Sequence, residues 1–401
     1  MAKKTIKDVD VSGKRVLVRV DFNVPLKDGE VTDDRRIKSA LPTIKSVIER
    51  GGRAVLMSHL GRPAGNGFES AHTLRPAADR LSELLGKPVA FPSQDCVDQA
   101  AADAVGAMKD GDVLLLENLR FHAGEKKGDA GFAKKLAAYA DVYVNDAFGA
   151  CHRDDASMVG VPEAMKGKPR VVGLLVEREI KYLSEALAEP KRPFVVVLGG
   201  AKVSDKIGAI EHLLPIADQV LVGGAMAYTF CKALGHGVGA SRVENDRLAD
   251  AQKMIDLAAR VDHELHVPFD HICSTEFSEH SGDIEIFEDS IPEGYMGLDI
   301  GPQTQSRYRR VIKTAKTVVW NGPMGVFEWA PFAVGTGSIA RGVAEATEAG
   351  ATTIIGGGDS AAAAEKFGVA DRVSHISTGG GAALEMLEGK SFRSVELLDN
   401  A

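Results

Sequence analysis

Short apolar runs that end abruptly in glycine constrain the fold of this chain more than any other feature. In the second half, five candidate strands end in glycines or Asn-Gly, at residues 194–200, 220–224, 318–322, 353–358 and 376–381. In the first half, comparable runs at 18–23, 56–62 and 115–120 end in charged or polar residues. Open α/β sheets bind their ligands at strand ends. Glycine lets backbone N–H groups approach a phosphate, whereas arginine binds carboxylate or phosphate directly. The two kinds of strand end therefore predict two anionic ligands, one for each half.

Longer helical patterns alternate with these runs. Examples lie at 40–50, 74–85, 132–139, 207–216, 247–259 and 361–367. Runs without polar alternation indicate strands buried on both faces, and alternation with helices indicates βαβ units. Because 401 residues are many for one compact domain, we expect an α/β protein with two doubly wound, Rossmann-like domains, each with a parallel sheet.

The domain boundary is expected beside the helical pattern at 176–188. Pro190 and Pro193 follow this pattern, and prolines end helices and stiffen junctions. The alternative is an ordinary crossover within one large sheet. The first interpretation gives a domain over 1–172, an interdomain helix and linker over 173–190, a second domain over 191–388 and a short tail over 389–401.

Composition excludes several classes of protein. A net charge of −8 argues against a nucleic-acid partner, which normally requires a basic surface. The four cysteines form no CxxC pair, so neither a disulfide framework nor a zinc site is expected, and a reducing cytosol fits best. No apolar run approaches the ~20 residues that cross a bilayer, and the first residues lack the apolar core of a signal peptide. We therefore expect a cytoplasmic protein without a membrane partner.

Polar and basic residues follow the candidate strands of the first half. In chain order they are Asp21, Asn23, Arg36, His59, Arg62, Arg120 and Arg153. Each has an ordinary alternative: an Asx turn closed by Asp21 and Asn23, a structural histidine, or an arginine in solvent. Four arginines near the strand ends of one half together predict a collected anion site.

The glycine-rich segments of the second half suit a polyphosphate. Lys202 and Lys206 follow the first of them and would share one face if a helix began soon after the glycines. Backbone N–H groups, a helix N-terminus and two ammonium groups would bind phosphates; the alternative is an ordinary turn with two exposed lysines. The chain contains neither a GxxxxGK[ST] motif nor a GxGxxG motif.

Three further segments of this half have two interpretations each. Asp359 is either a helix N-cap or a ligand of Mg²⁺ on a nucleotide, and the three preceding glycines favour the metal. The segment 378–382 repeats this design and could present N–H groups to a transferring phosphoryl group. The loop 321–328 is expected to bury little, with a β-turn that leaves Glu328 in solvent as the alternative.

Taken together, these segments resemble the phosphoglycerate kinase family over the entire chain. The matching stretches are 19–25, 58–63, 117–121, 198–206, 296–302, 320–328 and 356–360. The resemblance implies a monomer with two Rossmann-like domains that face each other across a cleft, joined by a hinge helix, with the tail 389–401 returning to the first domain. It also implies Mg²⁺-dependent, reversible phosphoryl transfer from 1,3-bisphosphoglycerate to ADP, giving 3-phosphoglycerate and ATP in glycolysis.

The resemblance assigns roles residue by residue. It implies a 3-phosphoglycerate site formed by Asp21, Phe22, Asn23, Arg36, His59, Leu60, Gly61, Arg62, Arg120 and Arg153. It implies a nucleotide site formed by Gly200, Ala201, Lys202, Lys206, Gly297, Asn321, Pro323, Glu328, Gly357, Gly358, Asp359 and Ser360, with Glu328 on the ribose and Asp359 on the metal. Catalytic roles fall to Arg36, Lys206, Gly380 and Gly381.

The chain departs from the family pattern at three places. Asp154 and Asp155 follow Arg153, where added negative charge could weaken an anion site; Tyr295 replaces a tryptophan, and Ala225 replaces a glycine. Two other functions remain open on the residues alone: a dinucleotide dehydrogenase, which the missing GxGxxG motif disfavours, and a non-enzymatic two-domain binding protein.

Overall fold

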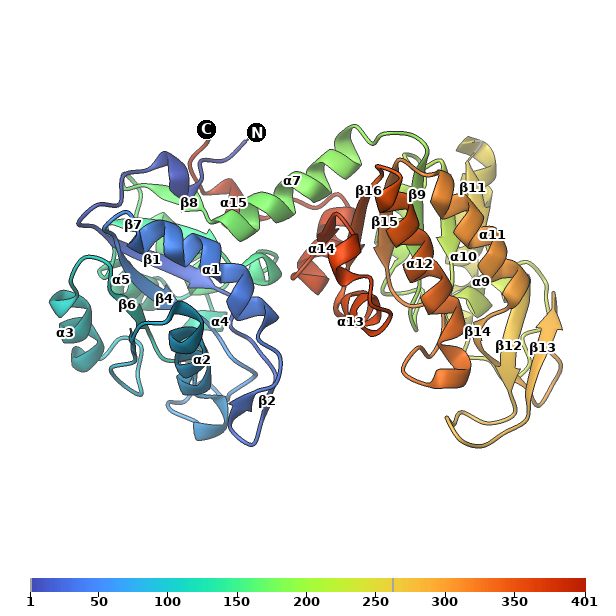
Figure 1. Cartoon of the computed structure of the whole chain (residues 1–401), viewed down its shortest axis with the longest axis horizontal. Coiled ribbons are helices and arrows are strands. Elements are labelled where there is room, and N and C mark those ends of the chain that lie inside the picture. Colours follow the sequence, from blue (N-terminus) through green and yellow to red (C-terminus); the bar gives the residue numbers. More distant parts are fainter. Residues whose placement is uncertain (1, 262) are drawn as a thin grey trace. The chain divides into compact units, whose positions relative to one another are not determined.

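The computed structural model describes residues 2–261 and 263–401 and divides into two compact units. The first unit contains the chain up to Lys181 together with Ser391–Ala401, and the second contains Tyr182–Lys390. Each unit is built around one parallel sheet, so the chain has the two-unit α/β architecture that the alternating pattern predicts (Figure 1).

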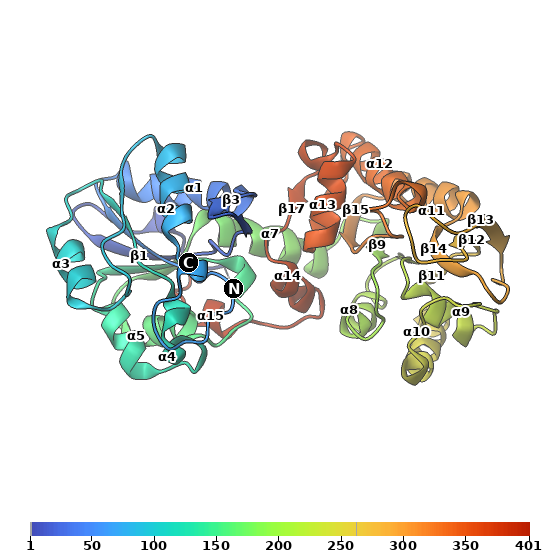
Figure 2. The same cartoon turned by 90° about the horizontal axis from the view of Figure 1, so that it is seen from below.

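The first unit has a six-stranded parallel sheet with the order β5-β6-β4-β1-β7-β8. From edge to edge its strands are β5 (Val89–Ala90), β6 (Val113–Leu115), β4 (Arg53–Met57), β1 (Arg15–Val20), β7 (Val142–Asp146) and β8 (Arg170–Val172). The helices are α1 (Arg35–Ile48), α2 (Arg75–Leu85), α3 (Gln99–Ala107), α4 (Ala123–Lys126), α5 (Ala130–Ala137) and α6 (Val161–Ala164), and β2 (Leu26–Lys27) pairs with β3 (Glu30–Val31) in a small hairpin. Figure 2 shows α1 and α2 on one face of the sheet and α4 and α5 on the other.

The second unit repeats this design with the order β11-β10-β9-β15-β16-β17. Its strands are β11 (Glu264–His266), β10 (Gln219–Val222), β9 (Phe194–Leu198), β15 (Thr317–Asn321), β16 (Thr352–Gly356) and β17 (His375–Ile376). Figure 2 shows α8 (Ile207–Leu213), α9 (Ala227–Ala233) and α10 (Leu248–Val261) on one face, and α11 (Pro302–Thr314), α12 (Val334–Glu348) and α13 (Gly358–Lys366) on the other. An antiparallel sheet, β13 (Ile284–Glu288), β12 (Asp270–Ser274) and β14 (Met296–Ile300), and the helix α14 (Gly380–Leu387) complete the unit.

The strand cores are buried on both faces, as their unbroken apolar runs predict. Every residue of β9 and of β15 is buried. In the first unit, Val16 and Val18 of β1 belong to one core cluster with Ile37 and Ile44 of α1. The spacing of the buried residues along α1 is helical, so the packing of one apolar stripe against the sheet fixes this helix.

Two helices begin earlier than their apolar patterns predict. The structure starts α1 at Arg35 rather than at residue 40, and α13 at Gly358 rather than at residue 361. In both cases the first turn is polar or glycine-rich, so it carries no apolar periodicity from which a start could be predicted. The first turn of α1 is also where Arg36 lies.

The helix α7 (Leu174–Ala188) contains the point at which the chain passes from the first unit to the second. The last residues return to the first unit, where α15 (Arg393–Glu396) lies and Lys4 N–H donates to the carbonyl of Asp399 at 2.9 Å. Both chain ends therefore belong to the same unit (Figure 1).

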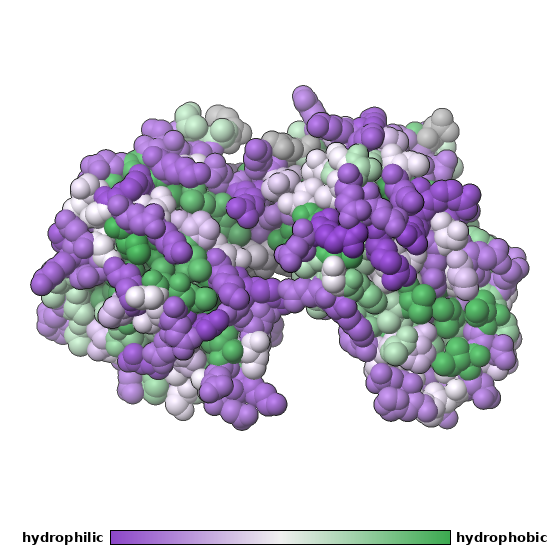
Figure 3. Space-filling view, in the orientation of Figure 1, coloured by the Kyte–Doolittle hydropathy of each residue, from purple (hydrophilic) through white to green (hydrophobic). Residues whose placement is uncertain are grey.

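Within the described residues, no helix is both long and apolar enough to cross a bilayer. The face shown in Figure 3 is mainly hydrophilic, with hydrophobic residues in separate small groups.

Candidate active site

The polar residues that follow the strands of the first unit converge because four of these strands are neighbours. The order β6-β4-β1-β7 places the loops that carry Arg120, His59, Asp21 and Arg153 side by side at the carboxyl edge of the sheet. The chain leaves β1 toward β4 on one side and later returns to β7 on the other, which makes this edge a topological switch point. Such points are where open α/β sheets bind ligands.

Arg36 is held against the loop that follows β1. Its Nη1 donates to the carbonyl oxygen of Asn23 at 2.9 Å and lies 3.2 Å from Asp21 Oδ2. Asn23 Oδ1 accepts from the N–H of Gly61 at 2.9 Å, which joins the β1 and β4 loops. The Asx turn is also present, since Asn23 N–H donates to Asp21 Oδ1 at 3.3 Å. The turn and the binding of Arg36 therefore coexist.

His59 is a neutral imidazole in this site. Burial, together with Arg19, Arg120, Arg153 and Arg36, lowers the pKa of His59 well below its usual value of 6.5. Arg19 Nη2 lies 3.0 Å from His59 Nδ1, and a guanidinium can only donate. This contact is shorter than the 3.5 Å between Arg153 Nη1 and His59 Nε2, so Nδ1 accepts and the single ring proton is on Nε2.

Arg19 is a site residue that the sequence did not single out. It lies in β1 between Val18 and Val20, so its neighbours predict only a buried strand. Its side chain is fully buried. Besides His59, it donates to Ser157 Oγ at 2.9 Å and to the Val20 carbonyl at 2.6 Å. The one available signal was a charged residue inside an otherwise apolar strand.

Arg120 and Arg153 complete the cationic group. Arg120 Nη1 donates to the Gly61 carbonyl at 2.8 Å, and Arg120 Nη2 lies 3.8 Å from Asp155 Oδ2. Of the two acidic neighbours of Arg153, Asp155 is buried beside Arg120, and Asp154 is exposed. Arg153 Nη1 lies 3.5 Å from His59 Nε2. Both of these nitrogens carry protons, so an acceptor between them would bind both.

The other residues assigned to this site differ in what they present. Phe22 and Leu60 are core residues, and their N–H groups donate to Ser58 Oγ and Asn118 Oδ1 at 2.9 and 3.2 Å. Gly61 has a φ of +64°, and a Cβ there would lie 2.6 Å from His72 Nδ1. Arg62 is exposed and has no side-chain partner in the part of the chain that the structure describes.

In the second unit, several strand-end glycines serve the packing of one loop on another. A Cβ at Gly199 would lie 2.1 Å from the carbonyl oxygen of Pro323, and one at Gly224 would lie 2.5 Å from the nitrogen of Gly200. Gly200 N–H donates to that same Pro323 carbonyl at 3.0 Å. At these positions the prediction that glycine exposes N–H groups to phosphate is wrong, because the neighbouring backbone occupies the space.

Two helix N-termini do meet at this edge of the sheet. The helix α13 begins at Gly358 and α14 begins at Gly380. A Cβ at Gly380 would lie 3.6 Å from the nitrogen of Gly358, and a Cβ at Gly358 would meet nothing within 4 Å. First-turn N–H groups have no intrahelical acceptor and carry the positive end of the helix dipole. Two such ends side by side form an anion site.

Lys206 belongs to the same place. It precedes α8, and its Nζ donates to Asn321 Oδ1 at the end of β15. Burial lowers the pKa of Lys206, while Asp205, Asp359 and Glu388 oppose that effect. The expected pairing of Lys206 with Lys202 on one helical face is wrong, since α8 begins only at Ile207 and Lys202 lies in the exposed loop before it.

Asp359 and Ser360 lie in the first turn of α13. The N-cap interpretation of Asp359 is wrong, because Gly357 is the N-cap residue, and Asp359 is exposed. Ser360 is buried, and its Oγ accepts from Gly322 N–H at 2.6 Å. Asp359 thus presents a carboxylate at the helix start, and Ser360 holds the loop that follows β15.

The remaining nucleotide-site candidates lie in loops and in β14. Ala201 and Glu328 are exposed, and Pro323 is half-buried. Gly297 is buried in β14, where a Cβ would lie 2.0 Å from the hydroxyl oxygen of Tyr228. The prediction that the loop 321–328 buries little is wrong, because Met324 and Phe327 belong to the core of this unit.

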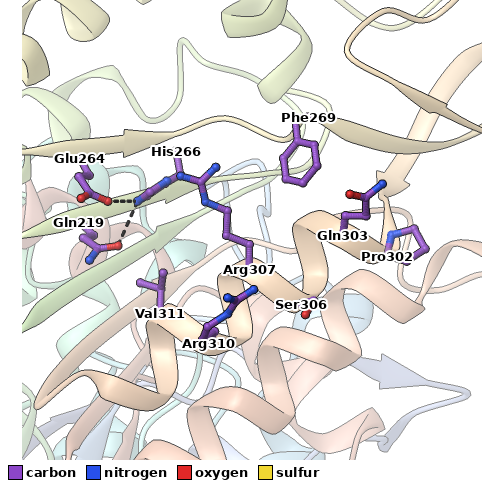
Figure 4. A pocket seen from close by; sticks show the side chains of 10 residues that line it. All are labelled: Gln219, Glu264, His266, Phe269, Pro302, Gln303, Ser306, Arg307, Arg310 and Val311. Atoms are coloured by element: carbon purple, nitrogen blue, oxygen red, sulfur yellow. Dashed lines mark hydrogen bonds and ion pairs between the residues drawn. The ribbon is translucent and has the colours of Figure 1, made fainter.

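Two surface hollows contain none of the residues assigned to these sites. One, of about 670 Å³, lies beside α11 and is lined by Gln219, Glu264, His266, Phe269, Pro302, Gln303, Ser306, Arg307, Arg310 and Val311 (Figure 4). The other, of about 610 Å³, belongs to the first unit and includes His122 and Lys127 in its lining. Switch-point geometry, rather than cavity size, therefore locates the candidate active site.

The chain has two doubly wound units. The first has arginines and a neutral histidine at its strand ends, and the second has paired helix N-termini and a lysine. Together these features define a two-domain phosphotransferase of the α/β class. A family model described as Phosphoglycerate kinase matches residues 6–390. The chain belongs to the phosphoglycerate kinase family.

Relatives with this name cover the chain from end to end. Phosphoglycerate kinases of Rhodopirellula baltica and Thermosipho africanus are 56% and 54% identical to it over 404 and 402 residues, which is 100% of this chain and 100% and 98% of theirs. Solved phosphoglycerate kinase structures from Coxiella burnetii and Pyrococcus horikoshii OT3 are 40% and 33% identical, with TM-scores of 0.88 and 0.84. These structures cover 98% and 99% of this chain, and the chain covers 98% of each.

The activity is therefore glycolytic phosphoryl transfer between ATP and 3-phosphoglycerate. The two alternative functions, a dinucleotide dehydrogenase and a non-enzymatic binding protein, are therefore excluded.

Proposed function

We propose that 3-phosphoglycerate and 1,3-bisphosphoglycerate bind at the carboxyl edge of the first sheet and that ADP and ATP bind at that of the second. One observation carries this assignment. Arg120 Nε and Asn321 Nδ2 are buried donors that have no hydrogen-bond acceptor among the described residues. Buried donors without acceptors are rare and costly. Other buried nitrogens without acceptors, such as Arg170 Nε and Arg247 Nε, also occur. Arg120 and Asn321 differ from them because they follow or end strands at the carboxyl edges of the two sheets, where a ligand oxygen would complete the structure.

The acidic substrate would be bound by charge and by directed donors. Arg120, Arg153 and Arg36 supply guanidinium groups, which suit carboxylate and phosphate. His59 supplies a neutral Nε2–H beside Arg153 Nη1. In this assignment Arg62 extends from the rim, and Gly61 with Asn23 joins the loops that hold the cations.

The nucleotide would place its phosphates at the N-termini of α13 and α14. The N–H groups that begin at Gly358 and at Gly380 and Gly381 then face the transferring group, and Lys206 follows it. Glu328, which is exposed, would bind the ribose, and Gly297 would lie beside the base.

Asp359 would hold Mg²⁺ on the nucleotide. Mg²⁺ in phosphoryl-transfer sites is bound by one or two carboxylates together with phosphate oxygens. Asp359 fits this donor set, because it is an exposed carboxylate in the first turn of a helix whose N-terminus would bind the phosphates. Bound there, the ion would neutralise charge on the phosphates.

No general base is required in this assignment. The acceptor in the ATP-consuming direction is a substrate carboxylate, which is ionised at neutral pH. Catalysis then depends on positioning and on neutralising charge on the phosphoryl group, which Arg36, Lys206 and the helix N-termini supply. We also propose that hinge bending brings the two substrates together. The protein would act as a monomer and in the cytoplasm.

Separate binding measurements test the assignment. Calorimetry should show that Arg120→Ala weakens 3-phosphoglycerate binding by about tenfold or more, the equivalent of a charged hydrogen bond, with MgADP binding unchanged. Asn321→Ala should weaken MgADP binding and leave 3-phosphoglycerate binding unchanged. Arg53→Ala is the matched control, because Arg53 pairs with Asp110 at the opposite end of β4. Equal losses of both ligands in either site variant would contradict the division between units.

A further inference from the structure

Asp95, Cys96 and His122 form a cluster in the first unit, outside the candidate active site. Asp95 and Cys96 lie in the loop between β5 and α3, and His122 directly follows the 3-10 turn Leu119–Phe121. One potential ligand atom from each residue lies within 4.8 Å of the other two. His122 Nε2 and Asp95 Oδ1 are 3.0 Å apart, and Cys96 is buried and is not in a disulfide.

We propose that these three residues bind a divalent transition-metal ion of the Zn²⁺ type. Thiolate, imidazole and carboxylate are the side-chain ligands of zinc. The thiol argues against Mg²⁺ and Ca²⁺, which prefer ligand sets made of oxygen. This site is therefore chemically different from the one proposed for Mg²⁺ on the nucleotide. Cys96 binds as the thiolate, and its proton goes to solvent.

The geometry is close to what tetrahedral binding requires. Zinc bonds of ordinary length place neighbouring ligand atoms about 3.3–3.6 Å apart. The present separations are at most 4.8 Å, so each must change by no more than about 1.5 Å. The ring of His122 is held by stacking on Phe132, with 4.9 Å between ring centroids. Asp95 Oδ1 accepts from Val97 N–H at 2.8 Å, which fixes the carboxylate at the start of its loop.

One of the three ligands borders an accessible space. His122, but neither Asp95 nor Cys96, lines the hollow of about 610 Å³, together with Lys127, Asp129 and Lys135. Three protein ligands next to an accessible space are typical of zinc sites that keep a water or another small ligand in the fourth position.

The positions of these residues also explain why the sequence did not predict a zinc site. The expectation of no zinc site rested on the missing CxxC spacing, but here the fold brings His122 to Cys96 from a different loop. His122 is two residues from Arg120, so the ion would tie the loop before α3 to the segment that carries Arg120.

Titration with Co²⁺ tests this inference. The full chain, freed of metal with a chelator and without nucleotide, should bind one equivalent of Co²⁺ and develop the visible bands of a tetrahedral site with a sulfur-to-cobalt charge-transfer band in the near ultraviolet. Zn²⁺ should displace the Co²⁺ and abolish these bands. Zn²⁺ should also raise the melting temperature, since a ligand that binds only the folded state stabilises it.

Substitutions of the three residues test which side chains bind the ion. Cys96→Ser should abolish the charge-transfer band, and His122→Asn should weaken Co²⁺ binding by more than about tenfold, the loss that even an outer-shell change can cause. Cys231→Ser is the matched control, because Cys231 is also buried but lies beside the Pro268 carbonyl. If Cys96→Ser does not fold, Asp95→Asn and His122→Asn still decide. Co²⁺ binding without the sulfur band, or binding that survives these variants, would overturn the proposal.

Discussion

Arg36 is the cation of the first unit whose position most directly suggests a role in transfer. Its guanidinium is half-exposed, yet it is fixed by the Asn23 carbonyl and the Asp21 carboxylate. A cation held in this way loses little freedom when charge develops on a phosphoryl group, which favours the transition state over the bound substrate.

Arg36→Ala should therefore lower kcat by about 10³-fold or more, the range found where an arginine stabilises phosphoryl transfer, with little change in ATP affinity. Steady-state kinetics and ATP calorimetry measure the two quantities. Arg35→Ala is the control on the same turn, because Arg35 pairs with Asp33. A parallel loss of ATP binding would place Arg36 in the nucleotide site instead.

Arg19 sets the tautomer of His59 at the end of a buried chain of polar groups. Ser157 Oγ accepts from Arg19 and donates to Glu125 Oε1 at 2.5 Å, and Glu125 is fully buried. The charge of Arg19 is thus compensated inside the unit, and its Nη2 remains directed at His59 Nδ1.

Nitrogen NMR should find the proton of His59 on Nε2 at neutral pH. Arg19→Met should remove this preference and raise the KM for 3-phosphoglycerate by about five- to tenfold, equivalent to one hydrogen bond. It should also destabilise the fold by about 3–5 kcal/mol, because Glu125 loses its buried partner. Arg19→Lys should recover most of the stability. An Nδ1–H tautomer in the unaltered protein would refute the role.

At the scale of elements, β14 is joined to the start of α12 by the carboxyl group of Asp299. It accepts from Gly335 N–H at 2.6 Å and from Ile300 N–H at 2.9 Å. Burial raises the pKa of Asp299 to about 8 despite these bonds. The same cause raises the pKa of Asp146, at the end of β7, to about 7.

These pKa values predict how stability depends on pH. Between the unfolded pKa near 3.8 and the folded pKa near 8, the folded chain holds a proton on Asp299 that the unfolded chain has lost. The free energy of unfolding should therefore decrease as pH rises through this window. Denaturant titrations at pH 5, 7 and 9 should show a smaller decrease in Asp299→Asn. An identical pH dependence in the variant would contradict the assignment.

The parallel sheets were predictable from the sequence because buried parallel strands leave unbroken apolar runs. The antiparallel sheet was not, since in the mainly exposed strand β13 Ile284 and Ile286 alternate with glutamates, so this strand lacks the unbroken apolar run of the others. The candidate site also has features that were predictable from the sequence and features that were not. Charged strand ends were visible in the sequence, whereas the contacts that explain Gly199 and Gly224 depend on how separate loops cross. Spacing along the chain contains no record of such contacts.

At the scale of the whole molecule, the chain passes through the first unit, forms the second, and ends in the first again. The returning segment is tied down at several points. Arg170 Nη2 lies 3.0 Å from Asp399 Oδ1, and Lys3 Nζ donates to the Leu398 carbonyl at 2.8 Å. The buried Ser394 donates its hydroxyl to the Cys151 carbonyl at 2.7 Å. Cys151 is two residues from Arg153, so the end of the chain supports a loop of the candidate substrate site.

Ser394→Ala tests whether that support matters for function. Loss of the buried bond should lower the free energy of unfolding by about 1 kcal/mol and weaken 3-phosphoglycerate binding several-fold, because the loop that carries Arg153 is less restrained. MgADP binding should stay the same, since its proposed site lies in the other unit. Arg393→Ala is the neighbouring control: it removes an exposed ion pair with Glu163, and such pairs contribute about 0–1 kcal/mol. Unchanged 3-phosphoglycerate affinity in Ser394→Ala, with the expected loss of stability, would limit the returning segment to a role in folding.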